Sequence, residues 1–187
     1  MAESAEAPRR LAAVVIPIFA DAPHEVVFVE RARHLRRHAG QIAFPGGALD
    51  EEDGGDLARA ALRELHEEIG IAASAVTIVG QLDPLRQQRN VFNVTPFVAV
   101  VAPGTPIVVD LNEASAAHRV PLGAILAPGA VHPGVEVSAD LHIHTQVFDY
   151  GGMHVWGLTG HILEAFLSRY RRPDSPLRAA LEARLLL

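Results

Sequence analysis

The chain has 187 residues, of which 49% are hydrophobic and 20% are charged, a composition typical of a globular domain long enough to bury its own core. Its formal net charge of -6 argues against general nucleic-acid binding, which usually requires a basic face. The sequence contains no cysteine, which excludes disulfides, thiol catalysis and cysteine-ligated metals. We therefore expect one domain over residues 1–187, in the cytoplasm, with neither a nucleic-acid nor a membrane partner.

Hydrophobic periodicity predicts strands and helices that follow one another along the chain. The first apolar run, residues 11–20, is about ten residues long, too short to span a membrane, and it lacks a clear signal-cleavage pattern. Strands are expected at Leu11–Phe19, Glu25–Glu30, Val76–Gln81, Val91–Val101 and Leu141–Phe148. Helices are expected at Asp56–Ile69, Thr159–Tyr170 and Pro176–Leu185, and loops at Pro84, Pro103–Pro106 and Pro128–Pro133. This order indicates an α/β fold in which helices pack on a mixed sheet.

The segment from Arg31 to Gly47, RARHLRRHAGQIAFPGG, is basic at its start and ends in a glycine turn. Its first eight residues hold four arginines and two histidines and no acid. In an acidic chain this cluster has two interpretations. It binds an anionic ligand, since arginine holds phosphate with paired hydrogen bonds, or it is a solvated loop whose cations pair with the acidic residues 50–56.

The helix expected at Asp56–Ile69 has an acidic face. Asp56 is a suitable N-cap, and Gly70 stands where a C-cap glycine ends a helix. At about 100° per residue, one side carries a cluster of carboxylates and the other side carries apolar residues. The carboxylates are Glu64, Glu67 and Glu68, and the apolar residues are Ala58, Leu62, Leu65 and Ile69.

Carboxylates three and four residues apart on a helix repel one another, and this cluster has two explanations. It provides the oxygen ligands that a hard divalent cation such as Mg²⁺ requires, or it is an acidic surface helix. A calcium loop starting at Asp50 fails on spacing. Gly55 fits the sixth position, but Gly54 occupies a ligand position and Ala61 stands where the terminal glutamate should be.

The stretch from Arg63 to Ile71, RELHEEIGI, resembles the second half of the Nudix box, R-E-U-x-E-E-x-G-U, where U is aliphatic. All of its fixed positions agree. The first half, counted from Gly47, is two residues longer than the general pattern, and Asp53 stands where that pattern has glutamate. Asp53 is therefore the first choice for the carboxylate that holds the box arginine, with Glu52 and Asp56 as alternatives.

The basic segment resembles the signature that precedes the box in coenzyme A pyrophosphatases, L-L-T-x-R-S-x3-R-x3-G-x3-F-P-G-G. The residues at matching spacing are Arg31, Arg36, Gly40, Phe44, Pro45, Gly46 and Gly47. The departures are Val27-Phe28-Val29 for the leading triplet and Ala32 for serine. Together the two motifs cover residues 27–71, about a quarter of the chain.

The Nudix resemblance implies an α/β/α sandwich and an enzyme that hydrolyses a diphosphate linked to another group, using Mg²⁺ or Mn²⁺. It implies metal ligands at Glu64, Glu67, Glu68 and the carbonyl of Gly47. Glu67 is the first candidate for the catalytic base and Glu113 the second. Arg63 and Glu64 complete the catalytic set, with the roles of base and ligand left unassigned among the box glutamates.

The signature implies the substrate. Coenzyme A or acyl-CoA would be cleaved to 3′,5′-ADP and 4′-phosphopantetheine or its acyl form, with substrate contacts at Arg31, Arg36, Gly46 and Phe44. Two alternatives stay open. One is a Nudix enzyme for ADP-ribose, NADH or a dinucleoside polyphosphate, and the other is a Nudix module that binds nucleotides without catalysis. The composition is compatible with a homodimer and does not require one.

Other polar and aromatic residues have simpler interpretations. His142 and His144 share one face of an expected strand, but no third ligand has the spacing of a zinc site. Trp156 is expected to pack near the start of the late helix.

Overall fold

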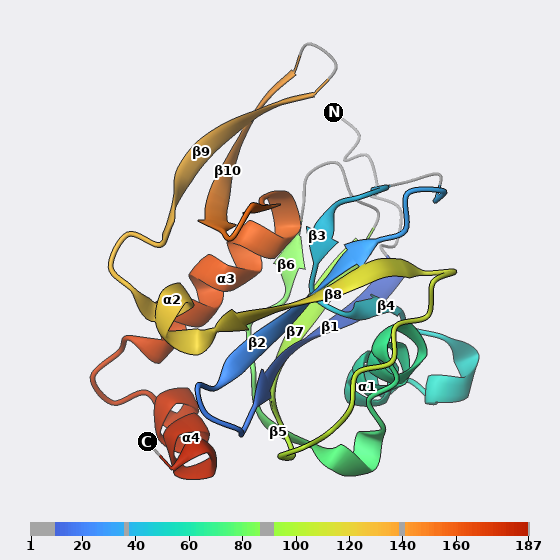
Figure 1. Ribbon diagram of the computed structural model, residues 1–187, viewed down its shortest axis with the longest axis vertical. Helices are drawn as coiled ribbons and strands as arrows, with labels where there is room; N and C mark the ends of the chain where they lie inside the picture. The colour runs from blue at the N-terminus through green and yellow to red at the C-terminus, as the bar shows by residue number, and fades with distance from the viewer. Residues whose placement is uncertain (1–9, 36–37, 87–91, 139–140, 187) are drawn as a thin grey trace, which may run out of the picture.

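A mixed sheet forms the centre of the computed structural model, which describes residues 10–35, 38–86, 92–138 and 141–186 (Figure 1). β1 runs parallel to β7, and the other pairings in this sheet are antiparallel. The path through the sheet is β3 (Ile42–Ala43), β2 (Glu25–Arg31), β1 (Arg10–Phe19), β7 (Phe92–Val101) and β5 (Val76–Gln81). Three further strands join it: β4 (Gly46–Ala48) beside β1, β6 (Leu85–Arg86) beside β7, and β8 (Ala114–Pro121) beside β2.

Both faces of the central strands are buried, because alternate residues enter two different hydrophobic clusters. Along β1, Val15 and Phe19 enter one cluster and Ile16 and Ile18 enter the other, all four without solvent exposure. A strand covered on both faces has a nearly continuous apolar sequence rather than an alternating one. This explains why residues 11–20 have the sequence LAAVVIPIFA.

Helices cover the two faces of the sheet separately. On one face α1 (Leu57–Ile69) packs through Leu65 and Ile69, and the short helices η1 (Glu51–Asp53) and η2 (Ala73–Ala75) flank it. The other face is covered by α2 (Leu122–Leu126), α3 (Gly157–Tyr170) and α4 (Pro176–Leu185). The expected α/β/α sandwich with a mixed sheet is confirmed (Figure 1).

A second sheet of three strands stands beyond α3, in the order β11 (Met153–Val155), β10 (Leu141–Tyr150) and β9 (Val131–Ser138) (Figure 1). His154 ties the three strands together. Its Nδ1 lies 2.7 Å from Oδ1 of Asp149 on β10, and its Nε2 lies 2.6 Å from Oε1 of Glu136 on β9. The hydrogen bonds to Asp149 and then Glu136 raise the pKa of His154 above its ordinary value of 6.5.

The predicted elements correspond to observed ones, with differences at their ends. The omissions are the short strands β3, β4, β6 and β11, the short helices α2, η1 and η2, and two longer strands. α3 begins at Gly157 rather than Thr159, and Val91, the expected start of the fourth strand, lies outside the described residues. The strands Ala114–Pro121 and Val131–Ser138 were missed. The first is rich in alanine, and the second contains a Pro-Gly pair, so the prediction of a loop through Pro133 was wrong. Within the described residues, every helix is too short or too polar to cross a membrane.

We predict that His154→Gln lowers the melting temperature at pH 6 and that the difference shrinks at pH 9. A histidine whose pKa rises on folding stabilises the fold fully below the unfolded value, and this contribution is lost as pH rises through the folded value. Thermal unfolding followed by circular dichroism at both pH values checks this, with exposed His144→Gln as the control. An equal loss at pH 6 and pH 9 would show that packing, not charge, explains the effect.

Candidate active site

Two consecutive glycines bring the backbone against the acidic helix. In β4, Gly46 lies opposite Val14 and Gly47 opposite Ala13 of β1. Gly46 has a φ of 156°, and a β-carbon there would collide with the backbone of Ala13 and Val14. At Gly47 a β-carbon would instead collide with the carboxylate of Glu64. Both positions therefore require glycine, the first for the strand pairing and the second for the approach of Glu64.

The register of α1 is fixed by its two ends. Asp56 caps the helix as expected, because its Oδ1 accepts a hydrogen bond from the amide of Ala58 at 2.8 Å. Gly70, with a φ of 72°, ends it and donates from its amide to the carbonyl of His66 at 2.8 Å. With both ends fixed, Glu64 and Glu68 lie one turn apart and face β4.

Three carboxylates from two distant segments converge beside β4. One ligand oxygen from each of Glu64, Glu68 and Glu113 lies within 4.8 Å of the others. Glu113 precedes β8, and its amide donates to the carbonyl of Asp110 at 3.0 Å. The amide of Asp110 donates in turn to the carbonyl of Glu68 at 3.0 Å, which ties this loop to the end of α1.

Glu68 is the buried member of this carboxylate cluster, with 2% of its surface exposed. Burial, followed by repulsion from Glu64, raises its pKa to about 8. Two groups partly compensate: the amide of Gly46 donates to its Oε2 at 3.2 Å, and Nη1 of Arg31 lies 3.8 Å from its Oε1. Burial also raises the pKa of Glu64. The cluster therefore holds more negative charge than the described residues neutralise.

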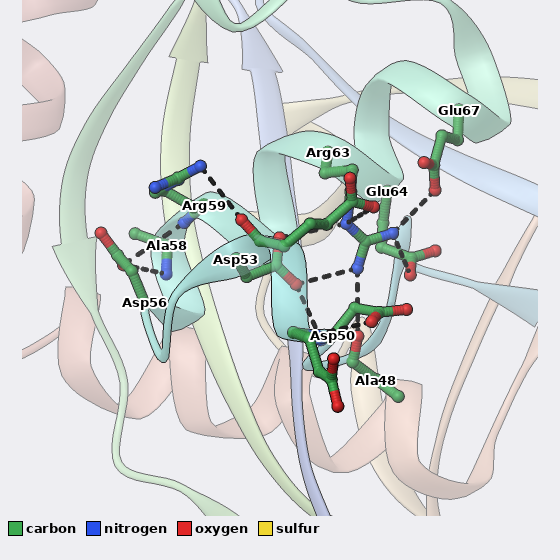
Figure 2. Close-up of polar contacts among 11 residues, drawn as sticks. Ala48, Asp50, Asp53, Asp56, Ala58, Arg59, Arg63, Glu64 and Glu67 are labelled. Atoms are coloured by element: carbon green, nitrogen blue, oxygen red, sulfur yellow. Dashed lines mark hydrogen bonds and ion pairs between the residues drawn. The ribbon is translucent and has the colours of Figure 1, made fainter.

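Arg63 occupies the centre of a second network on the outer side of α1 (Figure 2). It makes a bidentate contact with Asp53, with Nε to Oδ1 and Nη2 to Oδ2 both at 3.1 Å. Nη2 also donates to the carbonyl of Ala48 at 3.1 Å, and Nη1 donates to Glu64 at 2.9 Å and Glu67 at 2.8 Å. Arg63 thus joins the loop before α1 to two of the box glutamates.

Of the three candidates for the carboxylate that holds Arg63, Asp53 is the one that makes the bidentate contact. It is 2% exposed, its pKa is lowered by the hydrogen bond from Arg63, and the amide of Asp50 donates to it at 2.8 Å. Glu52 makes only a longer contact of 3.6 Å, and Asp56 is occupied by the helix cap. The extra length of the loop forms the short helix η1, whose end at Gly54 has a φ of 63°.

The helical projection grouped Glu67 with Glu64 and Glu68, and the structure differs. Glu67 turns toward Arg63 with 42% of its side chain exposed, and Glu113 completes the cluster in its place. Glu68 was placed on the face opposite the apolar residues, but it is buried beside them. Helical periodicity fixes the direction in which a Cβ atom points. The position of the end of a long side chain depends on the residue with which it interacts.

The residues expected to contact substrate have different positions. Arg31 and Gly46 adjoin the cluster through Glu68. Phe44 lies in the core, 3% exposed and stacked on Phe28 with 4.7 Å between ring centroids, so it supports the glycine turn rather than a ligand. Arg36 lies outside the described residues, as does Arg37.

The rest of the basic segment is only partly explained by ion pairing. Arg33 is 85% exposed and lies 3.7 Å from Glu30, not against the acidic loop 50–56. His34 contacts the carbonyl of Asn112 at 3.1 Å, and His38 contacts Gln41 at 2.8 Å. A cavity of about 230 Å³ opens beside Arg31, and Trp156 lines it together with His38. In the sequence, the feature that pointed to a binding site here was the run of arginines and histidines before the glycine turn.

A divalent cation suits the carboxylate cluster. Glu64, Glu68 and Glu113 supply the oxygen ligands that Mg²⁺ and Mn²⁺ prefer. The raised pKa of buried Glu68 shows that its negative charge lacks full compensation, which a cation would provide.

We predict that Mg²⁺ or Mn²⁺ raises the melting temperature of the protein and that Glu68→Gln abolishes this response. Ligand at about 100 times Kd stabilises a fold by about 2.7 kcal/mol. Without metal, Glu68 has a folded pKa of about 8 against an ordinary 4.5, so its contribution to stability falls as pH rises between them. Glu68→Gln should therefore stabilise the metal-free protein at pH 8, and a lower melting temperature there would contradict this account.

We predict different effects for alanine at the two glycines. Gly46→Ala collides with the β1 backbone and should cost about 1–3 kcal/mol of folding free energy. Gly47→Ala collides only with the flexible end of Glu64, so the fold should survive while metal affinity falls. Urea unfolding and metal titration of both variants separate the two effects. Equal destabilisation by both would show that Gly47 has no particular role at the metal site.

Comparison with known proteins agrees with this geometry. The family model described as NUDIX domain matches residues 8–141. Nudix hydrolase NudL of Salmonella paratyphi B, itself uncharacterized, is 40% identical over 156 residues, covering 83% of this chain and 80% of the relative. The NudL of Salmonella newport matches with the same identity and coverage.

Solved structures share the fold. The Nudix hydrolase RenU of M. smegmatis has a TM-score of 0.52 and 22% identity, covering 65% of this chain and 78% of its own. A MutT/nudix family protein of Enterococcus faecalis has a TM-score of 0.53 and 14% identity, covering 97% of this chain and 70% of its own. At these identities the likeness concerns the fold alone.

Proposed function

The chain belongs to the Nudix hydrolase family, and from this premise we propose that it cleaves the diphosphate of coenzyme A or acyl-CoA. The products are 3′,5′-ADP and 4′-phosphopantetheine or its acyl form. Family membership supplies the reaction class, which is the hydrolysis of a nucleoside diphosphate derivative. The proposal adds the substrate.

The observation that carries the proposal is the contact between Arg31 and Glu68. Arg31 comes from the segment that resembles the coenzyme A signature, and Glu68 comes from the Nudix box. Their side chains lie 3.8 Å apart, so the two motifs meet in one site. A diphosphate at the carboxylate cluster would therefore meet an arginine from the signature, which binds phosphate oxygens.

The catalytic roles follow from charge and position. Mg²⁺ or Mn²⁺ held by Glu64, Glu68 and Glu113 would neutralise the diphosphate and lower the pKa of an attacking water. Glu67 is proposed to accept the proton of that water, because it is half-exposed and leaves the ligand set to the other three. The water oxygen bonds to phosphorus while the bridging P–O bond breaks and the departing phosphate takes the electron pair.

Arg63 acts as a positioning residue in this scheme. It is held by Asp53 and contacts Glu64 and Glu67, and neighbouring carboxylates raise its pKa, so it stays charged. Its guanidinium keeps the two glutamates one turn apart despite their repulsion. The carbonyl of Gly47, beside Glu64, stays proposed as a further metal ligand, and the cytoplasmic location and a homodimer stay predictions.

We predict that the purified protein releases 3′,5′-ADP from coenzyme A only with Mg²⁺ or Mn²⁺, and faster than it cleaves ADP-ribose or NADH. Chromatographic product analysis of the three substrates, with and without each metal, checks this. Glu67→Gln should lower the rate about 10²–10⁴-fold while nucleotide binding survives, because it removes only the base. The matched control is Glu51→Gln, an exposed acid of the preceding loop.

The other outcomes identify the alternatives. Preferential cleavage of ADP-ribose, NADH or a dinucleoside polyphosphate would keep the Nudix chemistry and reject the coenzyme A assignment. Binding of nucleotides without turnover of any diphosphate would favour a non-catalytic module. The buried, mutually repelling carboxylates argue against that module, because nucleotide binding alone does not require them.

A further inference from the structure

The cavity beside Arg31 has a lining suited to the nucleoside end of a substrate. Its volume is about 230 Å³, below the roughly 300–1,000 Å³ of pockets that enclose whole ligands, so it fits one part of a larger molecule. Basic, amide, aromatic and aliphatic side chains line it. They include Arg31, His38, Gln41, Trp156, Ile42 and Leu158.

Arg31 connects the cavity with the carboxylate cluster. Its Nη1 lies 3.8 Å from Glu68, while its Nε is buried and has no hydrogen-bond partner among the described residues. The same side chain forms part of the cavity wall. Arg31 therefore adjoins both the carboxylate cluster and the cavity, so one substituent of a diphosphate at the cluster could extend into the cavity.

His38 adds an imidazole to the wall of the cavity that Arg31 also lines. A turn holds it, because the amide of Gly40 donates to the carbonyl of Arg31 at 3.0 Å and the amide of Gln41 donates to that of His38 at 3.1 Å. The ring Nδ1 lies 2.8 Å from Oε1 of Gln41. If Nδ1–H donates to this amide oxygen, Nε2 is left for a polar group of a ligand.

Trp156 also lines the cavity. β11 packs against β3, which brings the residues that follow β11 to the cavity. Trp156 precedes α3 without a side-chain cap, and Gly157 and Thr159 of the first turn also line the cavity. The positive end of a 14-residue helix therefore adds to the attraction for an anion, and the indole offers a flat surface on which a base can stack.

We propose that this cavity binds the 3′-phosphorylated nucleoside of the substrate, with Trp156 stacked on the base and His38 bound to the 3′-phosphate. The inference rests on the proposed function and adds two specificity-determining residues to it. The choice of end follows from charge. The pantetheine arm is uncharged, whereas the 3′-phosphate is the one charged group beyond the diphosphate, and the Arg31 guanidinium and the His38 ring on the cavity wall can bind its oxygens.

The first test compares coenzyme A with 3′-dephospho-CoA. We predict that the wild type prefers coenzyme A in kcat/KM by roughly tenfold or more, as expected for a hydrogen bond to a charged phosphate. His38→Gln should bring this ratio close to one through a loss on coenzyme A alone. Trp156→Leu should lower kcat/KM for both substrates alike by roughly tenfold, because both carry the base. A ratio that His38→Gln leaves unchanged would overturn the assignment of His38.

The matched control is His34→Gln. His34 lies in the same basic segment but outside the cavity lining, with its Nε2 on the carbonyl of Asn112, which glutamine can also reach. The ratio of kcat/KM for coenzyme A to that for 3′-dephospho-CoA should be the same in His34→Gln as in the wild type. An equal fall of the ratio in both histidine variants would show that the general charge of the segment, rather than the cavity, reads the phosphate.

A second measurement does not depend on turnover. Calorimetric titration with 3′,5′-ADP and with 5′-AMP should show tighter binding of 3′,5′-ADP by the wild type and equal binding by His38→Gln. This pattern in a protein that does not cleave coenzyme A would reject the proposed function and keep the inference. Cleavage of coenzyme A by a protein that binds the two nucleotides equally would keep the function and reject the inference.

Discussion

The close approach of α1 to the backbone of β4 is the constraint on which the site depends. Without side chains at Gly46 and Gly47, Glu64 reaches the strand and Glu68 accepts a hydrogen bond from the Gly46 amide. Glu68 is buried there beside Glu64, so its ionised form is costly and its pKa rises to about 8. The fold thus holds a local charge imbalance that a bound cation would remove.

Arg63 offsets part of the negative charge of the glutamates on α1. Glu64 and Glu67 would repel each other on one helix face, but both accept a hydrogen bond from the same guanidinium. Asp53 holds that guanidinium from the preceding loop in a bidentate contact, and the loop is itself closed by the bond from the Asp50 amide to Asp53. The two extra loop residues leave these contacts in place, since both the Asp53 carboxylate and the Ala48 carbonyl still reach Arg63.

The two faces of the central sheet carry different parts of the structure. α1 and the carboxylates lie on one face, and α3 with the core around Phe44 lies on the other. Residues at the end of β2 and in the segment that follows join the two, since Arg31 contacts Glu68 and also lines the cavity near Trp156. Arg31 therefore lies between the carboxylate cluster and the cavity at the start of α3.

The sequence by itself determined the features that depend on neighbours along the chain. The acidic helix, its Asp56 and Gly70 caps, the buried β1 strand and the Nudix box all follow from spacing over a few residues, because helical and strand periodicities are local. Only the tertiary structure placed Glu113 beside Glu64 and Glu68, turned Glu67 to Arg63, buried Phe44 on Phe28 and brought Trp156 to the same cavity as His38. These contacts join segments far apart in sequence, and strand pairing and side-chain partners decide them, neither of which a local pattern contains.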